Sequence, residues 1–314
     1  MDFGLGTLDF FFYHPAMLET VKPSEPTDWH LRLFKKSILK QAKLRQIVSL
    51  LGPVSGQTCL DVGGDNGVIS WNLRKLGGTW SSVDSSEKAV ESIRRLVGER
   101  VELMTGPVLP FEDGTFDVVV IIDMLEHLLE DYRFVVECHR VLKPNGRLVF
   151  NVPHIKPFAA LPPLRRMLGL TDDRHGHVRP GYTEAQVFDL MKDGFDVQEA
   201  RTYSRFFVEA LDTAIQFAAS RANKDAQAGA KGVLIDERDF GKMDKLFRIY
   251  SFLYPIFWFA AQFDKLLFFT KGYCLIGRAK RRRQWLPRKV PKLSDGRSIA
   301  EAALGSKIGT ATPF

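Results

Sequence analysis

The chain has 314 residues, of which 45% are hydrophobic and 26% charged, enough apolar side chain to fill one sizeable domain or two small ones. The formal net charge of +7 is concentrated, because residues 278–292 (RAKRRRQWLPRKVPK) hold eight basic residues and no acidic one. Attraction to polyanions is therefore a property of this segment, and a broad basic nucleic-acid-binding face is excluded.

The amino-terminal stretch and the cysteines bear on the compartment. Residues 1–15 (MDFGLGTLDFFFYHP) have no basic n-region, and their apolar run is too short and too acidic for a secretory signal. Cys59, Cys138 and Cys274 lie far apart in apolar segments, which is typical of reduced, buried thiols. We therefore expect a cytoplasmic protein without a disulfide or zinc site, and the sequence assigns no metal ligand.

The pattern of apolar residues predicts strands alternating with helices. An amino-terminal helix is expected over residues 28–51, ended by Gly52 and Pro53. Strands are then predicted over 58–62, 79–83, 101–104, 116–123 and 147–152, helices over 68–76, 86–97 and 124–142, and a turn at KPNG, residues 143–146. Strands that are apolar throughout indicate an open, mostly parallel sheet with helices on both faces, a Rossmann-like α/β fold.

In such sheets ligands bind beyond the carboxyl ends of the strands. The residues at those ends are 61–67, Asp84, 107–110, Asp123 and 151–154. Candidate site residues are therefore sought in these short segments.

The loop LDVGGDNG, residues 60–67, crowds three glycines behind a strand, but it does not have the G-x-G-x-x-G spacing of a dinucleotide loop. Asp65 stands where a polyphosphate would lie, and it would repel phosphate while attracting an ammonium or a sulfonium. Asp84, at the end of the second strand, is suited to the two hydroxyls of a ribose. The loop therefore predicts a nucleoside with a cationic, phosphate-free arm.

S-adenosylmethionine fits that description, and here the sequence resembles the class I S-adenosylmethionine-dependent methyltransferases, in particular the small-molecule group with the ubiquinone-type C- and O-methyltransferases. The resemblance covers roughly residues 44–197 and rests on LDVGGDNG, SVD, LPFEDGTFDVVVIIDMLEHL, HRVLKPNGRLVFNVPH and GHVRPGYTEAQVFDLMKDGFDV. It implies a seven-stranded sheet. The sequence departs from the family at Asp65, where glycine is usual, and at Pro107, where an acidic residue often meets the adenine amino group.

Loop chemistry and resemblance together assign a set of residues to the cofactor: Asp61, Gly63, Gly64, Asp65, Gly67, Asp84, Ser85, Val108, Leu109 and Asp123. His139 lies on the apolar stripe of its helix and is interpreted as a core residue. His154, then His177 and His127, are candidates for a base that takes a proton from the substrate hydroxyl. The alternative is that alignment of nucleophile, methyl and sulfur suffices and no base is used.

The predicted strands over 195–202 and 273–279 are separated by about seventy residues, where a short turn is normal. If the first runs parallel to the sheet, the insertion emerges beside the cofactor loop and caps the active site. Its aromatic stretch, residues 246–269, is interrupted by Pro255, Asp264 and Lys265, so we expect helices at a membrane interface or over an apolar substrate and not a bilayer span. An ordinary hydrophobic hairpin is the alternative.

We expect five segments: residues 1–52 as an amino-terminal segment and helix, 53–204 as the cofactor-binding core, 205–272 as the cap, 273–280 as the last strand and 281–314 as a basic, then flexible tail. This tail would favour an anionic membrane surface, or is simply solvated. The predicted function is methyl transfer to a small, lipophilic acceptor such as a quinone precursor. The rivals are a noncatalytic partner-binding module and a nucleic-acid methyltransferase guided by residues 278–292; NVPH at 151–154 only echoes the motif of the latter class.

Overall fold

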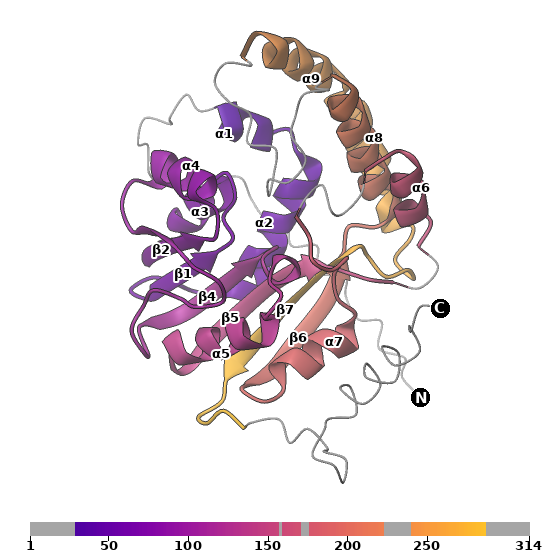
Figure 1. Cartoon of the computed structure of the whole chain (residues 1–314). Helices are drawn as coiled ribbons and strands as arrows, with labels where there is room; N and C mark the ends of the chain where they lie inside the picture. Colours follow the sequence, from indigo (N-terminus) through magenta and orange to yellow (C-terminus); the bar gives the residue numbers. More distant parts are fainter. Residues whose placement is uncertain (1–28, 157–158, 171–175, 223–239, 287–314) are drawn as a thin grey trace, which may run out of the picture.

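The computed structural model describes residues 29–156, 159–170, 176–222 and 240–286. Its seven-stranded sheet has the order β3-β2-β1-β4-β5-β7-β6 (Figure 1). Strands β1 to β5 are parallel, whereas β7 is antiparallel to both β5 and β6. The strands are Thr58–Val62, Thr79–Asp84, Val101–Leu103, Phe116–Ile122, Leu142–Pro153, Phe195–Tyr203 and Cys274–Arg281. The predicted Rossmann-like fold is confirmed.

Helices cover both faces of the sheet, because most strand positions are apolar on either side. Helices α2 (Ile38–Leu51) and α3 (Val68–Arg74) pack on one face, where Ile47, Leu51 and Leu73 are fully buried. Helices α5 (Asp131–Val141) and α7 (Glu184–Met191) pack on the other, and α4 (Glu87–Val97) lies beside β2 and β3 (Figure 1). The helices cover the faces of the sheet and not the carboxyl ends of the parallel strands, so a ligand can bind at those ends.

Two predicted helices are divided in the structure. The one expected over 28–51 consists of α1 (Trp29–Phe34) and α2, because the Ser37 hydroxyl accepts a bond from Lys40 N and starts a new helix. The one expected over 124–142 is a 3₁₀ turn, η2 (Leu125–His127), followed by α5. The Arg179 guanidinium donates hydrogen bonds to the carbonyl oxygens of Leu128 and Leu129. These bonds hold the chain between η2 and α5 in a non-helical form.

The residues of the predicted KPNG turn lie within β5, which begins at Leu142, but residues 143–146 have no paired residue in β4 or β7. The strand accommodates these residues through an irregularity opposite β4, between Phe116 and Val118, and through a left-handed backbone at Asn145, whose φ is 66°. The residues that form the turn pattern therefore lie near the start of a strand.

The segment between β6 and β7 forms a cap with helices α8 (Phe206–Ala222) and α9 (Phe240–Gln262) and the 3₁₀ turn η5 (Phe263–Lys265), and α6 (Leu161–Met167) lies beside α8 (Figure 1). Buried Asp264 accepts bonds from Arg205 N at 2.8 Å and Phe207 N at 2.7 Å, so it caps the start of α8. Because β6 runs in the direction of β5, the cap emerges at the edge predicted for the cofactor. Among the described residues, no helix combines the length and apolarity needed to cross a membrane.

The first part of the expected tail belongs to the domain. Strand β7 continues to Arg281, and the Arg282 Nε bonds Asp196 at 2.7 Å. Trp285 packs over Gly194, where an added Cβ would lie 2.0 Å from the indole ring. It also contacts His139, which is buried in the core as the sequence predicted. The expected boundary at 281 is therefore wrong for residues 281–286, and residues 287–314 lie outside the described part of the chain.

Candidate active site

The loop between β1 and α3 is built around glycines that no larger residue could replace without movement. Gly63 has φ of 86°, and a Cβ there would lie 2.3 Å from the Ile122 carbonyl oxygen. Gly67 has φ of 82°, and its Cβ would lie 2.8 Å from Ile93 Cα. At Gly64 the φ is ordinary, but a Cβ would lie 2.4 Å from Ser70 Oγ. These contacts press the loop against β4 and α4, which explains the glycine spacing.

Asp61 holds this loop from below. Its carboxylate is fully buried and accepts bonds from Ser70 Oγ at 2.5 Å, Ser82 Oγ at 2.8 Å and Arg74 Nη1 at 3.4 Å. Burial raises the pKa of Asp61, whereas Arg74 and the two hydroxyls favour its ionised form. The side chain thus connects β1, β2 and α3 and positions the loop.

A cavity of about 700 Å³ opens at the carboxyl ends of β1, β4 and β5. Its wall includes these predicted site residues: Gly63, Gly64, Asp65, Asp123, His127, His154 and His177. The structure thus brings the glycine loop and all three candidate histidines together. The other predicted residues are outside this wall: Asp61, Gly67, Asp84, Ser85, Val108 and Leu109.

Two of the three candidate histidines, His154 and His127, are held by backbone carbonyls. His154 is 7% exposed, and its Nδ1 lies 2.8 Å from the Gly272 carbonyl oxygen. His127 Nδ1 lies 3.1 Å from the Gly176 carbonyl oxygen, and its ring meets that of His177 edge to face at a centroid distance of 4.7 Å. A carbonyl oxygen can only accept, so Nδ1 of His154 and of His127 is the donor in these bonds.

Comparison with known proteins shows which family the part of the chain around this site matches. Residues 60–150, which contain the glycine loop, Asp84, the loop before β4 and most of β5, match the family described as methyltransferase domain. The chain carries a class I S-adenosylmethionine-dependent methyltransferase domain. Its predicted cofactor, S-adenosylmethionine, follows from that membership.

Two curated relatives are similar to part of this methyltransferase domain. A ubiquinone biosynthesis O-methyltransferase from Thiobacillus denitrificans is 33% identical over 110 residues, which cover 33% of this chain and 47% of that protein. A demethylmenaquinone methyltransferase from Clavibacter sepedonicus is 37% identical over 112 residues, which cover 33% of this chain and 46% of that protein. The chain thus spans about half the length of the curated relatives it matches.

A solved structure, that of the [4+2]-cyclase SpnF, resembles a larger part of the chain. It covers 77% of this chain and 81% of its own, with a TM-score of 0.52 and 18% sequence identity. A likeness at this identity concerns the fold of the methyltransferase domain and carries no information on its reaction.

The loop residues of the methyltransferase domain fit the methionine arm of the cofactor. Asp65 has φ of 50°, and within the described part of the chain its buried Oδ1 has no hydrogen-bond partner. Because Asp65 lines the cavity, this oxygen is suited to accept a bond from an ammonium group. Asp65 stands where the family usually has glycine, and it therefore adds a hydrogen-bond acceptor to the loop.

Asp84 lies behind that loop. It is fully buried, with Oδ2 accepting from Asp65 N at 3.3 Å and Oδ1 from Ser86 N at 3.1 Å. A carboxylate has about four acceptor positions, so a residue of this type can accept bonds from ribose hydroxyls as well as from backbone N–H groups. The role predicted for Asp84 stays a prediction, as do those of the exposed Ser85 and of the loop residues Val108 and Leu109.

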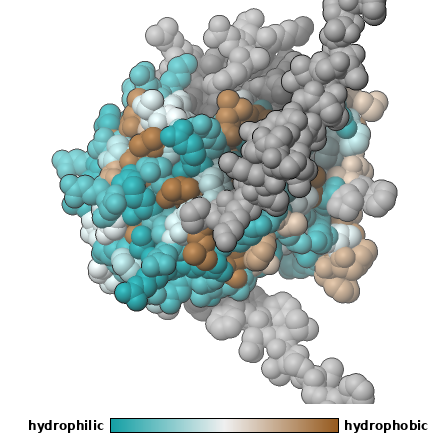
Figure 2. Space-filling view, turned by 60° about the horizontal axis from the view of Figure 1, so that its bottom comes forward, coloured by the Kyte–Doolittle hydropathy of each residue, from teal (hydrophilic) through white to brown (hydrophobic). Residues whose placement is uncertain are grey.

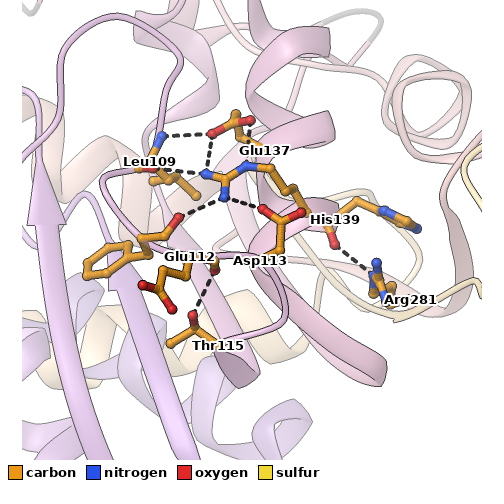
Figure 3. A network of polar contacts seen from close by, with 9 residues as sticks. Leu109, Glu112, Asp113, Thr115, Glu137, His139 and Arg281 are labelled. Atoms are coloured by element: carbon orange, nitrogen blue, oxygen red, sulfur yellow. Dashed lines mark hydrogen bonds and ion pairs between the residues drawn. The ribbon is translucent and has the colours of Figure 1, made fainter.

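The segment expected to meet adenine is fixed by Arg140 of α5 (Figure 3). The Arg140 guanidinium bonds the carbonyl oxygens of Leu109 at 3.0 Å and Phe111 at 2.7 Å, and it pairs with Glu137 and Asp113. Glu137 also accepts from Leu109 N at 3.1 Å, and the bond from Arg140 lowers the pKa of Glu137. Leu109 is consequently buried, whereas Val108 is 51% exposed, so only Val108 offers an apolar surface to a ligand.

Sequence reasoning missed a chain of polar contacts behind Asp123. Its carboxylate pairs with Lys43 of α2 and accepts from Asn151 Nδ2 at 2.6 Å, and Tyr203 Oη donates to Asn151 Oδ1 at 2.6 Å. Burial alone would lower the pKa of Lys43, but the pair with Asp123 outweighs it and holds that pKa above its ordinary value. The ammonium therefore stays charged, and no local signal links Lys43 to this site.

Proposed function

We propose that this chain transfers the methyl group of S-adenosylmethionine to an oxygen or carbon atom of a small, lipophilic acceptor. The observation that carries the proposal is a single cavity whose wall joins the glycine loop, at Gly64 and Asp65, to cap residues Glu209 and Asp212. The cap thus bounds the space in which acceptor and methyl donor would meet. The named relatives act in the biosynthesis of ubiquinone or on demethylmenaquinone, which favours a quinone precursor over the two rival functions.

The residues of the cavity suit this chemistry. The cofactor supplies an electrophilic methyl group on a sulfonium when bound. Asp65 holds the ammonium of its methionine arm, and Asp84 takes the ribose. His154 presents its basic Nε2 and accepts the proton of an acceptor hydroxyl, because Nδ1 is engaged by Gly272. The ion pair of Lys43 and Asp123 keeps the edge of the sheet between Asp65 and His154 rigid.

The cap also suits an acceptor delivered from a lipid surface. Phe252, Phe268 and Phe269 are 81%, 78% and 74% exposed, and Ile256, Trp258, Phe259 and Leu266 are exposed beside them in sequence. In Figure 2 the described surface is largely hydrophilic with scattered hydrophobic residues, and brown residues also gather at the right edge. Aromatic side chains prefer the headgroup level of a bilayer. We therefore propose peripheral contact with an anionic membrane; the cytoplasmic location stays a prediction.

The first test measures binding and turnover with the purified full-length chain. Calorimetry with S-adenosylmethionine is expected to give saturable binding that Asp65→Ala weakens by about tenfold, the size of one lost charge-assisted hydrogen bond. Labelled methyl is expected to pass to demethylated quinone precursors with a polyprenyl tail. His154→Asn should bind the cofactor normally and transfer methyl slowly, by about a hundredfold. A folded chain that binds no S-adenosylmethionine would contradict the proposal and favour the noncatalytic module.

The second test is flotation with vesicles that contain phosphatidylglycerol. The double variant Phe268→Ser/Phe269→Ser is expected to lose at least about tenfold in partitioning, because each ring buried at the interface contributes on the order of 1 kcal/mol or more. Leu129→Ser is the matched control, since Leu129 is 80% exposed but lies in the loop before α5. Equal partitioning of the two variants would refute membrane contact through the cap.

A further inference from the structure

Three cationic side chains line the cavity on the side of the cap. Lys156 follows strand β5, and Arg165 and Arg166 lie on α6, which packs beside α8 (Figure 1). The carboxylate of Glu209 on α8 acts electrostatically on both Lys156 and Arg165, which places these residues at one end of the cavity. These cations have no part in the methyl transfer described above.

Arg165 is neutralised within the cap. Its Nη2 donates to Glu209 Oε2 at 2.8 Å and lies 3.9 Å from Asp212 Oδ2, and its Nε donates to Thr213 Oγ1 at 2.8 Å. Glu209 is 4% exposed, so the pair is shielded from water. The pair joins α6 to α8 and therefore fixes the helix that presents Arg166 to the cavity.

Lys156 has no carboxylate within ion-pair distance among the described residues. Its Nζ donates to the Lys271 carbonyl oxygen at 2.8 Å and lies 3.8 Å from the centroid of the Tyr273 ring, both of which are neutral groups. The two acidic side chains that act on it, Asp264 and Glu209, are engaged by other groups. Burial lowers the pKa of Lys156, so a bound anion would stabilise its ammonium form.

Arg166 offers a second cation. Its side chain is exposed and lines the cavity, and it has no hydrogen-bond or ion-pair partner in the part of the chain that the structure describes. The same wall also contains apolar side chains, those of Ile155, Pro162, Pro163 and Leu170. This end of the cavity thus combines two available cations with an apolar surface, which suits a molecule with an anionic group and an apolar chain.

The number of available cations indicates a phosphate. A phosphate monoester carries about 1.5 to 2 negative charges at neutral pH and three strong acceptor oxygens. It would therefore compensate both Lys156 and Arg166, whereas a carboxylate would leave one of them without a counter-charge. The arginine fork can bind two phosphate oxygens at once, and the lysine ammonium acts as a point charge.

We propose that Arg166 and Lys156 bind the phosphate of an acceptor that also carries an apolar chain, such as a phosphate-linked prenyl lipid. The role of this molecule as methyl acceptor rests on the proposed function, whereas phosphate binding at the cap does not. A neutral acceptor can enter the same cavity, but it makes no contact of this kind with the two cations. Phosphate at the cap leaves the part of the cavity with Asp65 and His154 to the cofactor and the nucleophile.

The test measures binding of farnesyl phosphate to the full-length chain by calorimetry, with farnesol as the neutral probe of the same apolar chain. We expect farnesyl phosphate to bind at least about tenfold more tightly, the size of one hydrogen bond to a charged group. Arg166→Gln and Lys156→Gln should each weaken binding of farnesyl phosphate by about tenfold and leave that of farnesol unchanged. Arg166 is exposed, so its variant keeps the test valid should Lys156→Gln fail to fold.

Arg95→Gln is the matched control, because Arg95 is also an exposed helical arginine but lies on α4, outside the cavity wall. Equal affinity for farnesyl phosphate and farnesol, or a loss in Arg166→Gln no larger than in Arg95→Gln, would overturn the phosphate site. Binding of S-adenosylmethionine could then still support the proposed function. Phosphate-selective binding by a chain that does not bind S-adenosylmethionine would support the site and refute the transferase.

Inhibition kinetics test whether the phosphate belongs to the acceptor. Farnesyl phosphate is expected to compete with the demethylated quinone precursor in methyl transfer, and Arg166→Gln should raise its inhibition constant about tenfold. Noncompetitive inhibition would overturn the assignment to the acceptor. Tighter binding of the soluble lipid dihexanoylphosphatidylglycerol than of farnesyl phosphate would also overturn it, because the site would then belong to a membrane headgroup.

Discussion

Replacing Gly63 with alanine is expected to reduce affinity for S-adenosylmethionine by at least about a hundredfold. The substitution forces an L side chain to φ of 86° and sets its Cβ 2.3 Å from the Ile122 carbonyl oxygen. The positive φ alone costs roughly 1–2 kcal/mol, and the clash is with strand backbone, which cannot rotate away. The loop must therefore leave β4, and Asp65 moves with it. Calorimetry gives the affinity, and thermal unfolding reports the accompanying loss of stability.

The matched control for this change is Gly98→Ala. Gly98 has φ of 80°, but a Cβ there would meet nothing within 4 Å. It therefore carries the backbone strain without the close approach, and we expect a stability loss of about 1 kcal/mol with unchanged cofactor affinity. If the two variants bind the cofactor equally well, the contact between the loop and β4 has no part in forming the site.

Replacing Asp61 with alanine is expected to lower the free energy of unfolding by about 3–5 kcal/mol, the usual cost of breaking a buried ion pair. The change leaves the Arg74 guanidinium, which is 19% exposed, without its carboxylate, and it removes the acceptor of the Ser70 and Ser82 hydroxyls. Asp61→Asn keeps an acceptor oxygen, so we expect a smaller loss. Urea unfolding of the full chain, followed by circular dichroism, measures both.

A double variant separates the ion pair from general packing. In Asp61→Leu/Arg74→Met both charges are removed, so no buried charge is left unpaired, and the loss of stability should be smaller than in Asp61→Ala. A double variant less stable than Asp61→Ala would show that the hydroxyl contacts, and not the charge pair, dominate this part of the fold.

Much of the fold and of the cofactor loop could be predicted because the relevant information is local. The buried strands read as continuous apolar runs, and the positive φ values at Gly63 and Gly67 demand glycine at those positions. The helix expected over 124–142 was wrong because Arg179, distant in sequence, binds the carbonyls of Leu128 and Leu129. The spacing of apolar residues that predicts a helix carries no information about a distant side chain that binds the backbone carbonyls of the segment.

The amino-acid sequence by itself determined the order of strands and helices, the glycine loop and the class of cofactor, since each depends on neighbouring residues. Only the tertiary structure decided which side chains share the cavity. Lys43 reaches Asp123, at the end of β4, from helix α2, and His177 is brought to Glu126 and His127 by the bond between Val178 N and the Glu126 carbonyl. Such meetings depend on how crossover connections bring distant segments to one edge of the sheet, and backbone bonds of this kind are open to almost any residue, so they leave no mark in the sequence.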